Sequence, residues 1–309
     1  MEIITYANKS DVPMLKNLIK TLESNGYKYT VLGKGEKWKG FMTKIRSCLT
    51  YTKTLPDDQI IAVVDGYDVF ASGPSSEFVE RYKSYGYPLV VGAETRCGAN
   101  CVPLKEWWNH HASRITTTTL QYCNGGFYVG KAMDVALLLQ YMLDLGIDDD
   151  QIALGTYLNR YPERAMLDTK ALLVGNITPG DFKDIDVKGD KFVMAKTGQS
   201  PLFIHLPGKV CDLMVRANYV GRTLLGNDYH ETTTREVWNE WSKGLGQFFE
   251  KNFLPLIAII MVVWIIIIAI ILYAHSILIP FMGLVLIMFI AFVMWYSKFF
   301  SPPVRIDRK

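Results

Sequence analysis

The chain has 309 residues, half of them hydrophobic, and a formal net charge of +3 at pH 7. This charge is small and dispersed, so it excludes a typical nucleic-acid-binding surface. Five cysteines at irregular spacings exclude the disulfide framework of a small secreted protein. Much of the hydrophobicity lies near the C-terminus, and the remaining chain of about 230 to 250 residues is enough for one sizeable core.

The N-terminal part predicts a strand, a helix and a second strand. Residues 2–7 (EIITYA) favour a strand, residues 11–25 an amphipathic helix capped by Ser10 or Asp11, and residues 27–32 another strand. This opening predicts a parallel sheet with right-handed crossovers. The first strand begins directly, without a basic and apolar leader, so we expect no signal peptide.

A glycine-punctuated loop, GKGEKWKGF at residues 33–41, follows the second strand. Its glycines match neither a Walker motif nor the dinucleotide fingerprint. Trp38 in this loop either stacks on a nucleotide base or caps the core. Residues 42–53 then predict a helix, from which Lys44 faces either phosphates or solvent.

Two carboxylates end the central strand of the predicted sheet. An uninterrupted apolar run in QIIAVVDGYDVF, residues 59–70, indicates a strand that is covered on both faces. Asp65 stands at its C-terminal end, where open α/β sheets bind ligands, and Asp68 follows three residues later. The two side chains converge only if the chain turns, which Gly66 permits. They predict a Mg²⁺ or Mn²⁺ site that also holds substrate phosphates, and the alternative is a solvated turn.

The middle of the chain predicts further elements of the same fold. Residues 74–84 and 132–145 favour helices, and residues 88–91 favour a strand that ends in a turn at residues 92–94. Residues 95–121 form a polar insertion whose cysteines and histidines fit no standard zinc spacing. We therefore expect this insertion to be a loop that faces a substrate.

Three polar motifs come later in the chain. The paired glycines of CNGGF, residues 123–127, permit a close backbone approach to a ligand or simply mark a turn before a strand. Residues 148–151 (DDDQ) begin a helix through Tyr161, where acidic residues cap the helix and favour its dipole, although three exceed what a cap needs. Residues 172–210 predict short strands and turns, among which His205 is either a third metal ligand or a structural histidine.

Six segments occur in the order GKGEKWKG, VVDGYDVF, VVGAE, NGGF, DDDQ with TYL after it, and HLPGK with NYVG after it. In this order they resemble the glycosyltransferase domain of the multifunctional procollagen lysyl hydroxylases, over residues 3 to 225. That family has a GT-A fold and is related to glycogenin-like and collagen glycosyltransferases. Two departures concern the motif NSGGF, which is CNGGF here, and the tryptophan expected after Cys97, where this chain has Gly98.

The resemblance implies a Rossmann-like α/β domain of the GT-A type that uses a UDP-sugar and Mn²⁺, or Mg²⁺. It implies that the ion is held by Asp65, Asp68 and His205, with the UDP diphosphate filling the remaining positions. It assigns the donor-sugar side and catalysis to Asp149, Asp150 and Gln151. The nucleotide-binding residues that it implies are Thr5, Tyr6, Ala7, Trp38, Lys44, Tyr67, Asn124, Gly208 and Lys209.

The expected activity is transfer of a hexose, with glucose or galactose favoured, to a protein, glycan or lipid-linked acceptor. The resemblance favours retention of the anomeric configuration. Two alternatives are a membrane scaffold that binds a sugar nucleotide without turnover, and an enzyme that only hydrolyses the UDP-sugar.

The C-terminal part predicts membrane attachment. Two charge-free runs are each long enough to cross a bilayer core of about 30 Å. They are preceded by an amphipathic segment that lies at a membrane interface or packs on the catalytic domain. Basic residues on both flanks predict that the catalytic domain and both termini face the cytosol. The expected parts are a catalytic domain at 1–228, an amphipathic helix at 229–252, a hairpin at 253–297 with spans 253–274 and 277–296, and a basic tail at 298–309.

Overall fold

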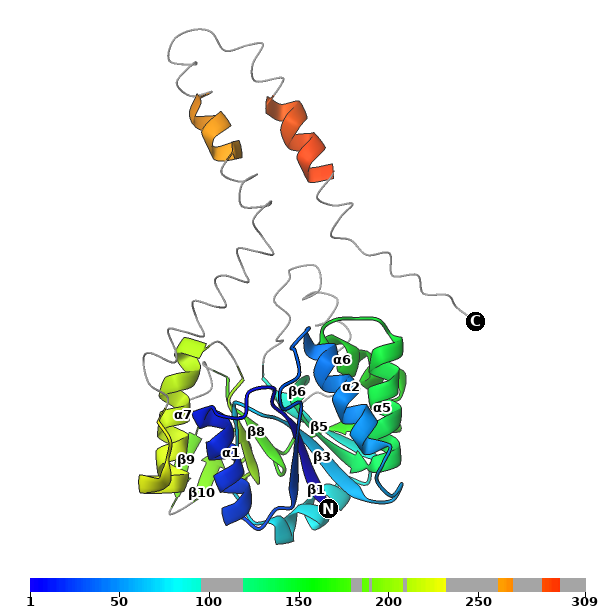
Figure 1. The fold of residues 1–309 in the computed structure, drawn as a ribbon, viewed down its shortest axis with the longest axis vertical. Coiled ribbons are helices and arrows are strands. Elements are labelled where there is room, and N and C mark those ends of the chain that lie inside the picture. Colours follow the sequence, from blue (N-terminus) through cyan, green and yellow to red (C-terminus); the bar gives the residue numbers. More distant parts are fainter. Residues whose placement is uncertain are drawn as a thin grey trace. The chain divides into compact units, whose positions relative to one another are not determined.

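The chain consists of two compact units, Met1–Val237 and Trp238–Lys309 (Figure 1). The computed structural model describes residues 1–95, 119–178, 185–188, 191–207, 210–231, 261–268 and 285–294. All the labelled strands and helices belong to the first unit, and the site discussed below lies within it.

A six-stranded mixed sheet forms the centre of the first unit, with the strand order β2-β1-β3-β6-β5-β7. β6 is antiparallel to its neighbours β3 and β5, whereas the other neighbours in the sheet are parallel. The parallel arrangement predicted for the opening β-α-β segment is confirmed, and so is the α/β fold class. The strands are β1 (Glu2–Tyr6), β2 (Tyr29–Leu32), β3 (Ile60–Asp65), β5 (Leu89–Glu94), β6 (Tyr122–Lys131) and β7 (Ala165–Leu167).

Helices cover both faces of this sheet (Figure 1). They are α1 (Pro13–Ser24), α2 (Phe41–Thr52), α3 (Phe78–Lys83), α5 (Ala132–Asp144), α6 (Asp150–Arg160) and α7 (Val210–Leu225), with the short turns η1 (Ser75–Glu77) and η3 (Gly226–Asp228). In β3, Ile61 and Val63 pack in one core with α2, α5 and α6, while Ala62 and Val64 pack in another with α1 and α3. This alternation explains why the strand is apolar at every position.

A second, three-stranded sheet has the order β4-β11-β8, formed by β4 (Val69–Ala71), β8 (Val174–Asn176) and β11 (Phe203–His205). A separate hairpin pairs β9 (Ile185–Lys188) with β10 (Lys191–Met194). The segment after β3 leads from the central sheet directly into β4 of the second sheet. Asp65 and Asp68 therefore lie where the two sheets meet, beside the end of β11.

Three local predictions were wrong, two of them because nonlocal strand pairing decided the outcome. Residues 92–94 do not form a turn but continue β5, since β6 extends far enough for Ala93 and Glu94 to pair with it across an irregularity in register. The CNGGF motif lies within β6 and not at a turn. Neither Ser10 nor Asp11 caps α1, because Val12 occupies that position and Pro13 begins the helix without needing an N–H partner.

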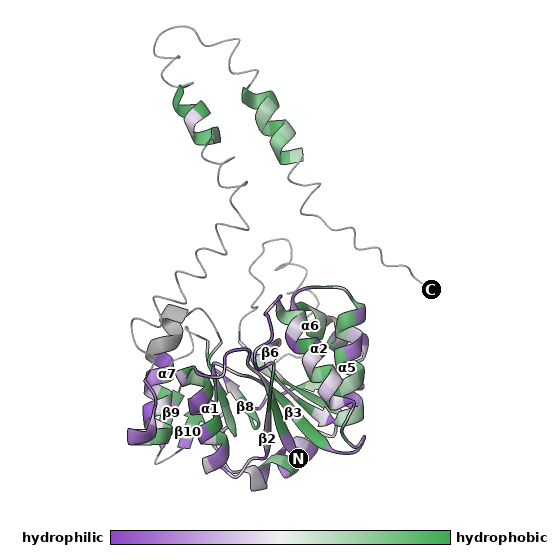
Figure 2. Ribbon diagram, in the orientation of Figure 1, coloured by the Kyte–Doolittle hydropathy of each residue, from purple (hydrophilic) through white to green (hydrophobic). Residues whose placement is uncertain are grey.

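The described residues of the second unit are two helical segments, 261–268 and 285–294. Figure 2 shows both as mainly hydrophobic, and their side chains are exposed, as for Trp264 and Ile287. Among the described residues, no helix is both long and apolar enough to cross a membrane. The remainder of both expected spans and residues 232–252 of the expected amphipathic helix lie outside the described residues, so the hairpin stays a prediction.

A cluster of buried aromatic rings joins the two sheets. The Phe203 ring lies 5.1 Å from Tyr27, 5.5 Å from Phe127 and 6.0 Å from Phe78, measured between ring centroids. All four residues are buried. Because Phe203 is two residues from His205, this packing also holds the end of β11 in place.

We expect Phe203→Ala to lower the free energy of unfolding of the first unit by about 3–5 kcal/mol, because it removes a ring and leaves a cavity between the sheets. Urea denaturation followed by circular dichroism measures the loss. Phe203→Leu, which keeps most of the volume, should cost clearly less. Equal losses for the two variants would contradict the cavity explanation.

Candidate active site

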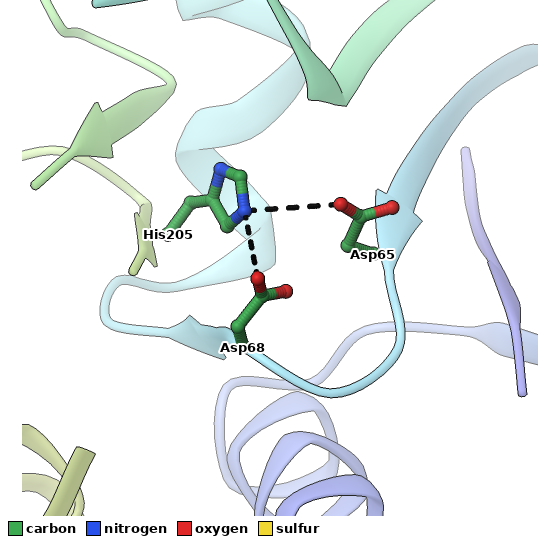
Figure 3. A group of neighbouring side chains, drawn as sticks. All are labelled: Asp65, Asp68 and His205. Atoms are coloured by element: carbon green, nitrogen blue, oxygen red, sulfur yellow. Dashed lines mark ion pairs between the residues drawn. The ribbon is translucent and has the colours of Figure 1, made fainter. Parts of the chain in front are cut away.

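Two carboxylates and an imidazole meet at the junction of the two sheets (Figure 3). His205 Nε2 lies 3.3 Å from an Asp68 carboxylate oxygen and 3.8 Å from one of Asp65. One ligand atom from each residue lies within 4.8 Å of the others, and His205 is buried. The residues predicted as metal ligands are therefore brought together by the fold.

Gly66 allows this convergence through its small size. The predicted turn is present, because β3 ends at Asp65 and the chain enters β4 of the other sheet at Val69, although the φ angle of Gly66 is not positive. A Cβ atom at this position would lie 2.6 Å from the Tyr6 carbonyl oxygen. A glycine therefore lets the DGYD segment pass close to the end of β1. A backbone hydrogen bond of 2.8 Å from Leu206 N to Asp68 O then fastens this segment to the end of β11.

The orientation of His205 is set by Asn176 at the end of β8. The Asn176 amide nitrogen donates to the Ala93 carbonyl at 2.9 Å, so its oxygen faces His205 Nδ1 at 2.6 Å. Nδ1 must therefore carry the hydrogen in the neutral ring, which leaves the lone pair of Nε2 directed at the carboxylates. A histidine that binds a metal usually donates its other ring N–H to an oxygen acceptor, and the Asn176 oxygen is such an acceptor here.

His205 Nε2 is buried yet has no hydrogen-bond partner, although Asp68 is close. Burial alone lowers the pKa of His205, but the nearby carboxylates of Asp68, Asp65 and Glu94 outweigh it and raise the pKa above its usual value. Two ligands of a Mg²⁺-sized ion lie about 3 Å apart when adjacent, which is near the spacing seen here. An unpartnered imidazole nitrogen beside two carboxylates thus fits a divalent cation.

A buried ammonium connects this cluster to the acidic motif of α6. Lys44, on α2, lies 2.9 Å from Asp65 and 2.7 Å from Asp150, and it donates to the Gly125 carbonyl at 3.3 Å. Burial lowers the pKa of Lys44, but Asp150 and then Asp65 raise it well above its ordinary value, so the side chain stays charged. Its predicted contact with the nucleotide stays a prediction, whereas its contacts with these two carboxylates are part of the structure.

A hydrogen-bonded network adjoins the ammonium. Glu94 accepts from the side chains of Asn124 at 3.1 Å and Gln151 at 2.9 Å. The Asn124 oxygen accepts from Gly126 N at 2.8 Å. Asn124 and Gln151 are thereby held on the same carboxylate, although they come from β6 and α6.

The paired glycines of β6 allow the strand to pass close to other site residues. A Cβ atom on Gly126 would lie 2.3 Å from the His205 ring, and one on Gly125 would lie 3.4 Å from the Asp150 carboxylate. The close backbone approach expected for this motif is therefore made to side chains of the protein itself.

The polar residues at the start of α6 make different contacts. Asp149 is the N-cap, because its carboxylate accepts from Ile152 N at 3.0 Å, and burial raises its pKa. Asp150 is buried against Lys44, and Gln151 contacts Glu94. The capping interpretation is thus confirmed for Asp149, and Asp150 and Gln151 are the two that face the cluster.

Three of the residues expected around the nucleotide lie at or after the ends of neighbouring strands: Tyr6 ends β1, Trp38 follows β2 and Tyr67 follows β3. The ring centroids of Tyr6 and Trp38 lie 5.7 Å apart, and the Tyr6 hydroxyl donates to Glu36 at 3.3 Å. Burial and Glu36 raise the pKa of Tyr6 to about 12, so this hydroxyl keeps its proton. The Tyr67 hydroxyl accepts from Lys9 N at 2.9 Å and donates to Asn8 at 3.1 Å.

Thr5 and Ala7 are buried on either side of Tyr6, and the Thr5 hydroxyl has no hydrogen-bond partner. Their assignment to a nucleotide pocket stays a prediction. Gly208 and Lys209 lie outside the described residues, as do Cys97, Cys101 and the two histidines of the polar insertion.

The sequence interpretation missed two residues of the site. Glu94 was placed in a turn, and Asn176 was not considered. Both stand at the C-terminal ends of apolar strand segments, VVGAE and LLVGN. The same rule that singled out Asp65 therefore applies to both, but their strand boundaries were not recognised in advance.

Among solved structures, the chain is similar to a glycosyltransferase involved in the glycosylation of the major capsid of PBCV-1. That likeness has a TM-score of 0.45 and 12% sequence identity, over 71% of this chain and 97% of the other.

Two curated relatives have names that concern procollagen lysine. Procollagen-lysine,2-oxoglutarate 5-dioxygenase of Drosophila melanogaster is 26% identical over 216 residues, which is 64% of this chain and 29% of the relative. The human multifunctional procollagen lysine hydroxylase and glycosyltransferase LH3 is 26% identical over 160 residues, 48% of this chain and 21% of the relative. The chain thus spans less than a third of the length of either protein.

A family model described as the PLOD GT domain matches residues 1–229. This segment contains the junction of the two sheets and all the described residues of the cluster. The resemblance drawn from the six sequence segments is confirmed, and the chain belongs to the PLOD GT domain family.

Proposed function

We propose that this chain is a metal-dependent glycosyltransferase that moves a hexose from a UDP-sugar to a protein, glycan or lipid-linked acceptor. The observation that supports it most is the convergence of Asp65, Asp68 and the unpartnered Nε2 of His205, in a chain of the PLOD GT domain family. Glucose or galactose, and retention of configuration, are the choices that the family favours.

The charge of the site supports a cation. The described residues of the site include the four carboxylates of Asp65, Asp68, Glu94 and Asp150 and the ammonium of Lys44, which contacts Asp65 and Asp150; with the carboxylates ionised, these five groups carry a formal charge of −3. Oxygen and imidazole ligands together with a diphosphate suit Mn²⁺, and Mg²⁺ is the alternative. When bound, such an ion neutralises the charge that the leaving diphosphate gains as the anomeric bond breaks.

The chain's own side chains position the donor and provide the electrostatic field of the site. Lys44 keeps Asp65 and Asp150 at a fixed separation, so the metal-binding and sugar-facing sides of the site do not move independently. Asp150 and Gln151 begin α6, where we place the donor sugar and its hydroxyls. Tyr6 and Trp38 form the aromatic side of the nucleotide pocket.

We further propose that the enzyme is an integral membrane protein whose catalytic unit faces the cytosol. The support is in the sequence, which has two charge-free runs at 253–274 and 277–296 with basic residues on both flanks. The acceptor is then presented at or near the cytosolic face of that membrane.

Release of UDP from a panel of UDP-sugars, with and without Mn²⁺, tests the transferase. We expect release with one preferred sugar, abolished in Asp65→Asn/Asp68→Asn because both metal-binding charges are gone. Asp58→Asn, an exposed carboxylate outside the site, is the control and should behave as the parent protein.

The products separate the alternatives. Free UDP with a glycosylated acceptor supports transfer, and free UDP with free sugar supports a hydrolase. Binding of Mn²⁺ and UDP without release, even with candidate acceptors added, supports a scaffold. Absence of any Mn²⁺-dependent binding of UDP would refute the metal site.

Asn176→Ala should weaken Mn²⁺ binding by about 10- to 100-fold, because His205 loses the partner that directs Nε2 to the ion. Isothermal titration calorimetry of the full chain measures this affinity. Asn159→Ala on α6, which removes a hydrogen bond within the helix, is the matched control. An unchanged affinity in Asn176→Ala would show that this contact is not needed.

Lys44→Met should lower the free energy of unfolding by about 3–5 kcal/mol, because it leaves two carboxylates without their buried partner. Turnover should fall, whereas Mn²⁺ affinity should not weaken, since the site becomes more negative. Denaturation, calorimetry and UDP release on one preparation measure all three. The exposed Lys53→Met is the control, and a parallel loss of metal binding would contradict the role given to Lys44.

A further inference from the structure

A buried arginine of α7 lies beside the ends of the two strands that carry Asn176 and His205. Arg216 is only 3% exposed. One of its guanidinium nitrogens, Nη1, donates to the Ile177 carbonyl, and the other, Nη2, donates to the Pro207 carbonyl at 3.1 Å. Ile177 directly follows β8, and Pro207 lies two residues after the end of β11. The guanidinium therefore bridges the two strands just beyond their last residues.

The place of this bridge follows from the hydrogen-bond pattern of the two strands. β8 and β11 are parallel, with Asn176 opposite His205. In a parallel pair, the N–H and the carbonyl of one residue bond to two residues of the partner strand that lie two positions apart. Phe203 N donates to the Leu173 carbonyl at 2.8 Å, and Ile177 N donates to the His205 carbonyl at 2.8 Å. The next bond in this series would run to the Ile177 carbonyl from the residue two after His205.

A proline stands where that bond is needed. Residue 207 is Pro207, which has no backbone N–H. Arg216 Nη1 donates to the Ile177 carbonyl in its place, and Nη2 binds the carbonyl of the proline itself. A guanidinium suits this task because its N–H groups point in fixed directions, so one side chain binds two carbonyls. The arginine thus replaces the missing backbone bond and extends the link between the strands by one step.

The bridged positions adjoin the proposed metal site. Asn176, whose oxygen lies 2.6 Å from His205 Nδ1, directly precedes one of the bridged residues. Leu206, which lies between His205 and the other bridged residue, donates its N–H to the Asp68 carbonyl at 2.8 Å. A shift of either strand end would therefore move the imidazole or its amide partner relative to the carboxylates.

The same two strands are bridged at their other ends by Arg81 of α3. Its Nη1 donates to the Leu172 carbonyl at 2.9 Å and to the Ser200 carbonyl at 2.6 Å, shortly before β8 and β11 begin. Its Nη2 donates to Glu77 at 2.5 Å. Arg81 thus joins the strands where they begin, and Arg216 joins them where they end, which is the side of the proposed metal site.

We propose that Arg216 is a positioning residue of the metal site, which replaces the backbone bond that Pro207 cannot make and so holds His205 and Asn176 at the spacing that a divalent cation requires. The inference rests on the metal-dependent function proposed above. The charge of Arg216 by itself opposes a cation, because like charges repel. Removal of the side chain therefore changes Mn²⁺ affinity in opposite directions through position and through charge. We expect position to dominate, because metal–ligand distances tolerate only about 0.2 Å.

Calorimetric titration of the full chain with Mn²⁺ tests the proposal. Arg216→Met removes the donors and should weaken Mn²⁺ binding by about 10-fold, the lower end of the range for groups that orient metal ligands. Arg81→Met is the matched control, because it also removes two hydrogen bonds to carbonyls beside the same strands. Both variants should unfold at a lower temperature than the parent chain, but only Arg216→Met should lose Mn²⁺ affinity.

A restored backbone donor tests the mechanism. Pro207→Ala supplies the N–H that the strand pairing lacks, so Arg216→Met/Pro207→Ala should bind Mn²⁺ more tightly than Arg216→Met. In the parent chain, Pro207→Ala should change the affinity less, because Arg216 already binds the Ile177 carbonyl. The two substitutions are therefore expected to be non-additive, which independent losses of stability would not produce.

Arg216→Lys keeps the charge and a single donor group, so its Mn²⁺ affinity should lie between those of the parent chain and Arg216→Met. If Arg216→Met does not fold, the comparison of Arg216→Lys with Arg81→Lys takes its place, with a loss of affinity expected for Arg216→Lys alone.

Four results would overturn the inference. A parent chain that does not bind Mn²⁺ would refute the metal site and the role of Arg216 together. A parent chain that binds Mn²⁺, with an Arg216 variant that binds it equally or more tightly, would refute the role of Arg216 alone. An equal loss in the Arg81 variant would assign the effect to general stability. Lack of any recovery on Pro207→Ala would refute the replacement of the backbone bond.

Discussion

The buried ammonium of Lys44 is the interaction on which the rest of the site depends. It lies between Asp65, at the end of β3, and Asp150, at the start of α6. Without it, two carboxylates would stand close together at low solvent exposure, which is strongly unfavourable. With it, the carboxylates of Asp65 and Asp150, to which the proposed function assigns the metal and the donor sugar, both contact one ammonium carried by α2. Beside this pair, the carboxylate of Glu94 accepts hydrogen bonds from the neutral side-chain amides of Asn124 and Gln151.

The second constraint is space. For Asp65, Asp68 and His205 to share a cation, β1, β3 and β6 of the central sheet must lie close to β11 of the second sheet. Gly66 and Gly126 stand at the two closest approaches, where any side chain would collide with a backbone oxygen or with the imidazole. The aromatic cluster around Phe203 stabilises this arrangement, because it packs the second sheet against the first.

One edge of the central sheet carries the candidate active site, where β1 and β3 end. The strand ends provide the carboxylates, the loop after β2 provides exposed aromatic and basic side chains, and the last described residues of the unit run along α1 toward that edge.

Local sequence determined the central strand, its terminal Asp65 and most helices, because apolar periodicity and strand ends depend on near neighbours. Motif order also identified the family, and with it His205 as a ligand candidate. Tertiary structure alone decided that β6 runs antiparallel, that Glu94 continues β5, and that Asn176 orients His205. Each of these depends on contacts between residues far apart in sequence, whose register no local pattern encodes. It likewise decided that Lys44 binds two carboxylates, since only the folded chain brings α2 and α6 together.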